Sequence, residues 1–248
     1  MKKNDLMQNA LKLPSGARFY RCALQVNPFE YLRRHNKASP FADEDSYNTA
    51  IVKACHENNI EVIAITDHYR VRSSESLREA ATKAGIYVFP GFEAVTKDGV
   101  HLLCLFDSNR DVTSLERVLG DCGIHDDEIA SPTGKYDVIE FLKESWDNWG
   151  AVCIAAHVAS SGGLLNTLPG RTAINAWKWP HLLACALPGP VSHAPYGIRQ
   201  IIENKIAEYR RNRPIAVVNA QDISSPEDLS KPGASCWIKM SEVSVEGL

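Results

Sequence analysis

The stretch AITDHYRV, residues 64–71, places an acid–base pair directly after a run of mostly apolar residues. Asp67 and His68 follow residues that suit a buried strand, and polar chain comes after them. In parallel α/β folds, the side chains at the carboxyl ends of the strands meet on one face, where functional sites are built. The stretch therefore predicts a strand that ends at a functional face.

Similar apolar runs recur along the chain, and helical patterns separate most of them. The runs are FYRCALQV (19–26), VIAIT (62–66), IYVFPGFEAV (86–95), HLLCLF (101–106), AVCIAAHV (151–158), LLACALPG (182–189) and IAVVNAQD (215–222). The helical patterns cover residues 45–58, 74–84, 135–149 and 197–209. Short apolar strands that alternate with amphipathic helices predict an α/β fold with helix-covered parallel strands. Seven such strands favour a barrel over an open sheet.

Three segments depart from this alternation. Lys97-Asp98-Gly99 joins two strand patterns and predicts a hairpin-type turn. Residues 107–134 have the character of a surface insertion, and no linker or repeat divides residues 1–248, which predicts a single domain. The sequence closes on CWIKMSEVSVEGL, an amphipathic pattern without terminating residues, so we expect a further domain to follow it.

The composition is that of an ordinary globular domain. The chain has 248 residues, of which 44% are hydrophobic and 23% charged, with a formal net charge of -3. The charge excludes a global basic field toward nucleic acid or membranes, although a local basic groove stays compatible with it. The seven cysteines are spread singly, which predicts reduced core residues of a cytoplasmic protein. No apolar run is long enough to predict a membrane span.

Metal-capable residues stand at several strand ends, and their joint occurrence favours a metal site. They are Asp67, His68, Glu93, His101, His157 and Asp222. A mixture of imidazole and carboxylate is what divalent metals such as zinc or manganese bind. The alternatives are structural: a single strand-end histidine is commonly a hydrogen-bonded packing residue, and Asp222 precedes ISSPEDL, where it would serve as a helix cap. The other histidines, at positions 35, 56, 125, 181 and 193, read as surface or packing residues.

The ordered set VIAITDH, FPGFEAV…HLLCLF, AAHVASSGG and VVNAQDISSPEDL resembles the motifs of the polymerase and histidinol phosphatase (PHP) superfamily over about residues 19–230. HLLCLFD and KMSEVSVEGL further resemble the amino-terminal PHP domain of proteins that carry an SMC/AAA-type ATPase. The resemblance implies a distorted (β/α)7 barrel with a phosphoesterase site, typically of three metal ions. It also implies a C-terminal ATPase region as partner, a homo-oligomer and, for some members of the group, antiphage defence.

The first and last motifs depart from the family pattern. The family opens with Asp-x-His-x-His, and this chain has Ala23, Gln25 and Asn27 at those three positions. Its closing Asp-x-His becomes Asp222 followed by Ser224. Amides bind transition metals poorly compared with imidazole, so these metal positions lose ligands.

Glu93, His101 and His157 form the one position that the resemblance leaves whole, which predicts one divalent ion, Zn²⁺ or Mn²⁺, or none. Asp67 would then orient a neighbour through a hydrogen bond. Arg70 and Arg171 are candidates for binding a nucleic acid or nucleotide substrate.

Two functions follow from these residues. The first is a degenerate PHP-like domain that serves as a structural, regulatory or nucleic-acid-sensing module of a larger ATPase, with weak or no hydrolysis. The alternative is a metal-dependent phosphoesterase or nuclease that uses a reduced metal site.

Overall fold

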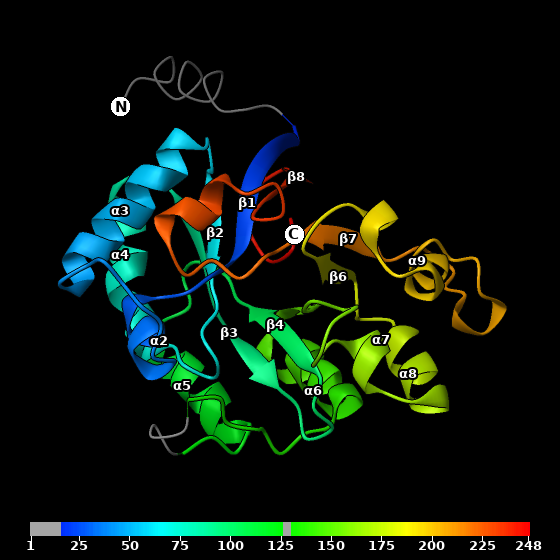
Figure 1. The fold of residues 1–248 in the computed structure, drawn as a ribbon. Coiled ribbons are helices and arrows are strands. Elements are labelled where there is room, and N and C mark those ends of the chain that lie inside the picture. Colours follow the sequence, from blue (N-terminus) through cyan, green and yellow to red (C-terminus); the bar gives the residue numbers. More distant parts are fainter. Residues whose placement is uncertain (1–15, 126–129) are drawn as a thin grey trace, which may run out of the picture.

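A mixed eight-stranded sheet forms the centre of the protein in a computed structural model that describes residues 16–125 and 130–248. The strands are β1 (Arg18–Val26), β2 (Val62–Ile65), β3 (Tyr87–Val95), β4 (His101–Leu105), β5 (Val152–Ala155), β6 (Ala184–Leu187), β7 (Ala216–Asn219) and β8 (Cys236–Met240). Their order in the sheet is β7-β6-β5-β4-β3-β2-β1-β8 (Figure 1). The seven predicted apolar runs are therefore all strands.

The strand directions divide the sheet into two parallel halves. β1, β2 and β3 are parallel, and so are β5, β6 and β7. β4 lies antiparallel between β3 and β5. The predicted turn between β3 and β4 is confirmed: the Gly99 amide donates to the Thr96 carbonyl oxygen (2.8 Å), and Gly99 has a φ of 81°. Glycine suits that left-handed conformation because it has no Cβ.

The sheet is almost closed into a barrel. The segment after β7 returns to the end of β1, where Val26 and Ile223 form a parallel bridge. Two hydrogen bonds hold it, from the Asn27 amide to the Ile223 carbonyl (2.9 Å) and from the Ile223 amide to the Gln25 carbonyl (2.9 Å). The fold is thus a mixed α/β, nearly closed barrel.

An eighth strand is the main difference from the predicted set. β8 pairs antiparallel with β1, from Arg18 opposite Met240 to Cys22 opposite Cys236. The chain there alternates between more and less exposed residues, which is the two-residue period of a strand with one face in the core. The amphipathic pattern of CWIKMSEVSVEGL therefore corresponds to an edge strand followed by turns.

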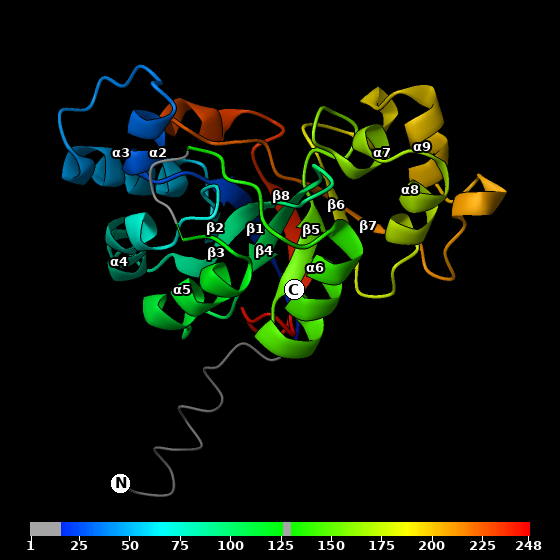
Figure 2. The same ribbon diagram turned by 90° about the horizontal axis from the view of Figure 1, so that it is seen from below.

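Helices surround the sheet on several sides (Figures 1 and 2). They are α2 (Phe29–Arg34), α3 (Glu44–Glu57), α4 (Glu75–Lys83), α5 (Val112–Asp121), α6 (Val138–Glu144), α7 (Leu164–Thr167), α8 (Gly170–Trp177) and α9 (Tyr196–Ile202). Single turns of 3-10 helix lie at Arg72–Ser74, Val191–His193, Ala207–Tyr209 and Pro226–Ser230, and a π-helical turn at Ser145–Trp149. None of the helices in the described part of the chain has the length and apolar character to cross a membrane.

Local sequence explains where the helices begin. At α3 the Asp43 side chain accepts from the Ser46 amide (2.8 Å), and the Ser46 hydroxyl faces the Asp43 amide in return. Asp137 and Glu140 make the same reciprocal cap at α6. Such caps satisfy amides that have no partner within the helix. The predicted helix over 197–209 is shorter than expected, because α9 ends at Ile202.

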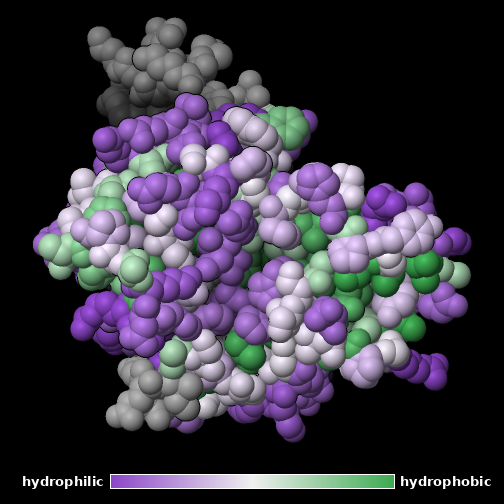
Figure 3. Space-filling view, viewed as in Figure 1, coloured by the Kyte–Doolittle hydropathy of each residue, from purple (hydrophilic) through white to green (hydrophobic). Residues whose placement is uncertain are grey.

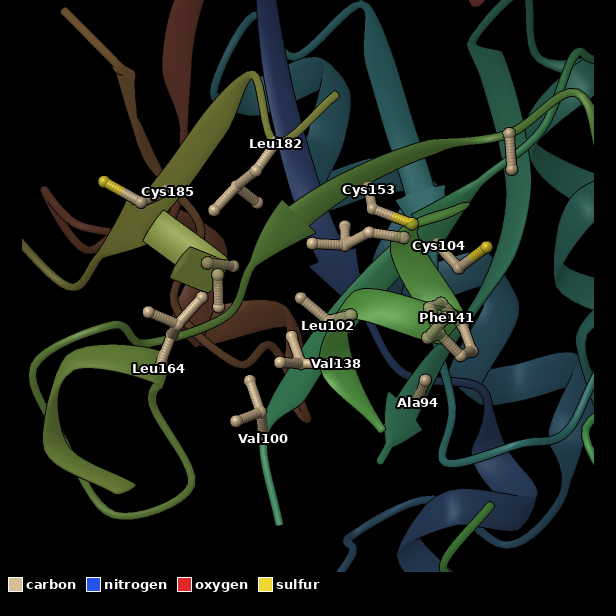
Figure 4. Packing of buried hydrophobic residues seen from close by; sticks show 14 of the residues in the cluster. Ala94, Val100, Leu102, Cys104, Val138, Phe141, Cys153, Leu164, Leu182 and Cys185 are labelled. Atoms are coloured by element: carbon tan, nitrogen blue, oxygen red, sulfur yellow. The ribbon is translucent and has the colours of Figure 1, made fainter. Parts of the chain in front are cut away.

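Apolar side chains fill the barrel and the two layers outside it. One outer layer lies between the strands and α3 and α4. Another lies between β4, β5 and the helices α5, α6 and α8. Figure 4 shows part of this second layer, with Leu102 of β4, Cys153 of β5 and Phe141 of α6. The segment 107–134, which the sequence presents as a surface insertion, contributes to that second layer: Leu115, Val118 and Leu119 of α5 are buried. Residues 126–129 of this segment lie outside the described residues.

The outer surface differs between the two sides of the molecule. On the face shown in Figure 3, hydrophilic residues prevail around α2 and α3, whereas hydrophobic residues gather on the side of α7, α8 and α9. All seven cysteines are free, and six of them are buried, as the sequence predicts.

Candidate metal centre

The candidate site lies where the strands present their functional ends. His68 follows β2, Glu93 lies near the end of β3, and His157 follows β5. His101 is the first residue of β4. Because β4 runs antiparallel to its neighbours, its first residue lies on the face where the parallel strands end. The topology therefore brings these four residues together from four different strands.

Three imidazoles surround the Glu93 carboxylate. The ligand atoms of His68, Glu93 and His101 all lie within 4.8 Å of one another. His101 Nδ1 is 2.7 Å from Glu93 Oε1, and His157 Nε2 is 3.4 Å from the same oxygen. The ring centroids of His68 and His101 are 5.7 Å apart, and those of His101 and His157 are 4.9 Å apart. We call these four residues the histidine–glutamate cluster.

The Glu93 carboxylate stays ionised although it is 4% exposed. Burial acts to raise the pKa of Glu93, but hydrogen bonds with His101 and His157 and the charge of His68 outweigh burial and hold that pKa below its usual range. Gln25 Nε2 also donates to Glu93 Oε2 (2.8 Å). A buried carboxylate among imidazoles provides the negative charge that a divalent cation would neutralise.

Two buried imidazole nitrogens test whether the cluster fits such an ion. His68 Nδ1 and His157 Nδ1 have no hydrogen-bond partner among the described residues. Buried polar atoms are nearly always satisfied, so orphaned nitrogens on the rings that surround Glu93 indicate a missing partner. Three imidazoles and one carboxylate are also ligands of the kind that zinc and manganese accept. The residues therefore fit a divalent metal ion.

A glycine turn packs against the cluster from the loop after β5. A Cβ on Gly162 would lie 2.6 Å from His101 Cδ2, and one on Gly163 would lie 2.3 Å from the His157 carbonyl oxygen. The His101 amide donates to the Gly162 carbonyl (2.8 Å). Gly162 has a φ of 76° and His157 a φ of 28°. The turn thus holds His101 and His157 in place by close backbone contact.

Asp67, a predicted site residue, pairs through Oδ2 with residues outside the histidine–glutamate cluster, and its buried Oδ1 has no partner among the described residues. Its side chain is fully buried and forms an ion pair with Arg34 of α2, and the Ser73 hydroxyl donates to it (3.3 Å). Burial raises the pKa of the Asp67 carboxyl, against the opposing effect of the Arg34 guanidinium. The backbone of Asp67 does support the site, because its carbonyl accepts from the Glu93 amide (3.0 Å).

Asp222 also has protein partners of its own. Asn27 Nδ2 donates to Asp222 Oδ1. Lys37 Nζ lies 3.1 Å from Asp222 Oδ2, and the Ser224 hydroxyl donates to that oxygen over 3.3 Å. Lys37 Nζ donates to Ser224 Oγ as well (2.8 Å). Asp222 therefore belongs to a second group of residues, which we call the Asp222 corner: Asn27, Lys37, Asp222 and Ser224.

The two predicted substrate-binding arginines lie in different surroundings. Arg70 is 7% exposed and donates through Nη1 to the Tyr69 carbonyl (3.1 Å). Arg171 is an exposed residue of α8 and lines a surface pocket together with Lys178 and Glu208.

His35 is a residue of the site that sequence reasoning missed. It was expected to be a surface or packing residue, yet its ring centroid lies 5.5 Å from that of His68 and 4.3 Å from that of Tyr31. His35 Nε2 is buried without a partner among the described residues. Burial, together with the neighbouring charge of His68, lowers the pKa of His35. His35, His68, His101 and His157 form a row of four imidazoles.

Comparison of structures finds this fold in known proteins. No protein-family model matches the sequence, and no curated protein is significantly similar to it. Endonuclease Q from Pyrococcus furiosus is similar with a TM-score of 0.63 and 13% identity, over 93% of this chain and 55% of that chain. Endonuclease Q in complex with a 27-mer duplex substrate carrying an abasic lesion at the active site gives a TM-score of 0.63 and 12% identity, with the same coverage.

A smaller protein shares the fold as well. A structure from Bifidobacterium adolescentis assigned as a metal-dependent phosphoesterase has a TM-score of 0.50 and 14% identity, over 85% of this chain and 88% of that chain. The chain thus spans about half the length of the two endonuclease Q structures but most of the phosphoesterase. At these identities the similarities establish a common fold.

Proposed function

We propose that this chain is a metal-dependent phosphoesterase domain of PHP type that uses one divalent ion. The histidine–glutamate cluster carries the proposal, because it joins three imidazoles to an ionised, buried carboxylate. His68, Glu93, His101 and His157 would hold the ion, with Zn²⁺ or Mn²⁺ as the candidates. When bound, the ion would polarise a phosphoryl oxygen and lower the pKa of a bound water.

The surrounding residues have separate tasks in this proposal. Gln25 fixes the orientation of Glu93 through its amide, and the glycine turn fixes His101 and His157. His35 lies beside His68 with a lowered pKa, so it resists protonation and adds little positive charge next to a bound ion. These contacts position the ligands before a substrate arrives, which is how a rigid site favours the transition state.

Phosphodiesters of nucleic acids are the proposed substrate class. Support comes from the common fold with endonuclease Q, whose structure holds a duplex with an abasic lesion, and with the B. adolescentis protein. The C-terminal ATPase partner, the homo-oligomer and the role in antiphage defence stay predictions.

The non-hydrolytic reading of the sequence rests on a different observation. Gln25, Asn27 and Ser224 hold hydrogen bonds to Glu93 and Asp222 at the positions where family members have metal-binding histidines. These hydrogen bonds favour a site that binds fewer than three metal ions. Fewer ions would lower the rate of phosphodiester hydrolysis. The intact histidine–glutamate cluster favours retained hydrolysis over a purely structural module.

A phosphodiesterase assay tests the proposal. The full chain is incubated with bis(p-nitrophenyl) phosphate and with an oligonucleotide duplex containing one abasic site, in the presence of Mn²⁺ or Zn²⁺. We expect hydrolysis that stops on chelation and falls at least ~100-fold in Glu93→Gln, because the variant removes the charge that holds the ion. Glu116→Gln is the control, since Glu116 forms only an exposed ion pair with Arg72. Equal rates for wild type and Glu93→Gln would refute the proposal.

A further inference from the structure

Lys37 occupies the centre of the Asp222 corner. Its ammonium nitrogen lies 3.1 Å from Asp222 Oδ2 and 2.8 Å from Ser224 Oγ. The same nitrogen lies 4.5 Å from the centroid of the Tyr31 ring, within the range of a cation–π interaction. An anion, a hydroxyl and an aromatic face thus converge on one cation.

The other oxygen of Asp222 is occupied as well. Asn27 Nδ2 donates to Asp222 Oδ1, and it also donates to the Ile223 carbonyl (3.2 Å). Since a carboxylate only accepts, the side-chain nitrogen of Asn27, not its oxygen, must face Asp222. An amide nitrogen does not ligate divalent metals, so a metal ion at this corner would have to displace both Asn27 and Lys37.

Arg34 repeats the arrangement at Asp67. Both cations come from one segment, the end of α2 and the three residues that follow it, and each neutralises an aspartate that follows a strand of the barrel. Glu93 differs: among the described residues the side-chain hydrogen-bond and ion-pair partners of its carboxylate are the imidazoles of His101 and His157 and the amide of Gln25. Of these three strand-end carboxylates, Asp67 and Asp222 thus each pair with a cation of the protein, whereas Glu93 has imidazole and amide partners.

We propose that Lys37 is a resident cation that takes the place of a second metal ion and keeps divalent ions out of the Asp222 corner. This inference rests on the proposed function, which places the single ion at the histidine–glutamate cluster. A divalent ion near Asp222 would have to displace the Lys37 ammonium from both Asp222 and Ser224, against a repulsion that solvent reduces because the pair is partly exposed. The site is thereby limited to one ion per chain.

Metal counts in engineered variants test the role of Lys37. Asn27→His and Ser224→His together give the Asp222 corner two imidazoles beside its carboxylate. With Lys37 retained, the double variant is expected to bind no more metal than wild type. With Lys37→Ala added, it is expected to bind one ion more per chain. The count is made by elemental mass spectrometry after incubation with excess Mn²⁺ and gel filtration.

The design separates failure of this inference from failure of the proposed function. If the wild type binds no ion, the proposed function fails. The effect of Lys37→Ala can still be measured in that case, as the difference in metal count between the double variant with and without Lys37. Lys231→Ala in the double variant is the matched control, because Lys231 pairs with Asp228 at 2.6 Å in a similar way outside the corner. It is expected to add no ion.

Two results would overturn the inference. One is an extra ion in the double variant that still has Lys37. The other is no extra ion after Lys37→Ala in a variant that keeps the first ion and its circular dichroism. If the histidine at buried position 27 prevents folding, the single Ser224→His variant with and without Lys37→Ala gives the same comparison, because Ser224 is only partly buried.

Discussion

At the scale of single residues, the stability of the fold and the chemistry of the site depend on how buried charges are paired. Glu93 is stabilised by imidazoles and by the amide of Gln25, whereas Asp67 depends on Arg34. A buried charge without a partner is costly, so each of these pairs has consequences for folding as well as for function.

Arg34→Met tests the pairing of Asp67. The Asp67 side chain is fully buried and that of Arg34 is 18% exposed, so the variant leaves a buried carboxylate with only Ser73 as a side-chain donor. We expect the free energy of unfolding to fall by about 3–5 kcal/mol, as is typical for breaking one partner of a buried ion pair. Urea unfolding followed by circular dichroism measures it.

The control for Arg34→Met is Arg33→Met, because Arg33 forms an exposed pair with Glu30 in the same helix. That change is expected to cost less than about 1 kcal/mol. Similar costs for the two variants would contradict the assigned role of the Arg34–Asp67 pair.

The pH dependence of stability tests the burial of His35. Its folded pKa is lowered from 6.5 by burial, so below pH 6.5 the unfolded chain binds a proton that the folded chain resists. The contribution of His35 to the free energy of unfolding is complete above pH 6.5, and it decreases as the pH is lowered toward the folded pKa of His35. In metal-free protein, we expect His35→Gln to lose less stability than wild type between pH 7.5 and 5.5.

His56→Gln is the matched control, since His56 is an exposed residue of α3. It should leave the pH dependence of the wild type unchanged. The same slope of unfolding free energy against pH in His35→Gln and wild type would exclude the proposed environment of His35.

At the scale of elements, the loop after β5 sets the geometry of the histidine–glutamate cluster. Gly162 combines a φ of 76° with a position at which any Cβ would collide with the His101 ring. The position of His101 thus depends on a residue that has no side chain.

Gly162→Ala tests this contact. The added Cβ would lie 2.8 Å from His101 Nε2, so His101 must move away from its place in the cluster. We expect the affinity for Mn²⁺ to fall at least ~10-fold, as is typical when the support of a metal ligand is disturbed. Isothermal titration calorimetry measures the affinity.

Gly150→Ala separates the loss of backbone freedom from the clash. Gly150 has a φ of 64°, and a Cβ there would meet no atom within 4 Å. It is expected to destabilise the fold without changing metal affinity. Equal metal affinities for Gly162→Ala and Gly150→Ala would show that the turn does not hold His101.

The elements also show why the sequence predicted some features and missed others. Strands β1 to β7 were predictable because each is a continuous apolar run. β8 was not, because it is short and half-exposed, and its strand character depends on pairing with β1. α9 was predicted too long, since helical periodicity does not show where tertiary contacts end a helix.

The candidate site was predictable to a similar degree. His68, Glu93, His101 and His157 stand at strand ends, and the sheet topology alone brings them together. Asp67 and Asp222 also stand at strand ends, but their partners come from the α2 segment. The placement of His35, Arg34 and Lys37 depends on how that short helix packs, which no local pattern encodes.

At the scale of the whole molecule, the barrel separates two kinds of site on one face. The histidine–glutamate cluster gathers three imidazoles around one carboxylate, and the Asp222 corner pairs an aspartate with Lys37. The barrel shares its fold with endonuclease Q over 93% of this chain. The proposed function and the proposed role of Lys37 together predict one divalent ion per chain.

Metal content tests this claim most directly. The full chain is purified without added metal and analysed by elemental mass spectrometry beside Glu93→Gln, with Glu116→Gln as control. We predict about one divalent ion per chain in wild type and control, and none in Glu93→Gln, because that variant removes the carboxylate at the centre of the cluster. No bound ion in any of the three proteins, before or after incubation with Zn²⁺ or Mn²⁺, would contradict the account.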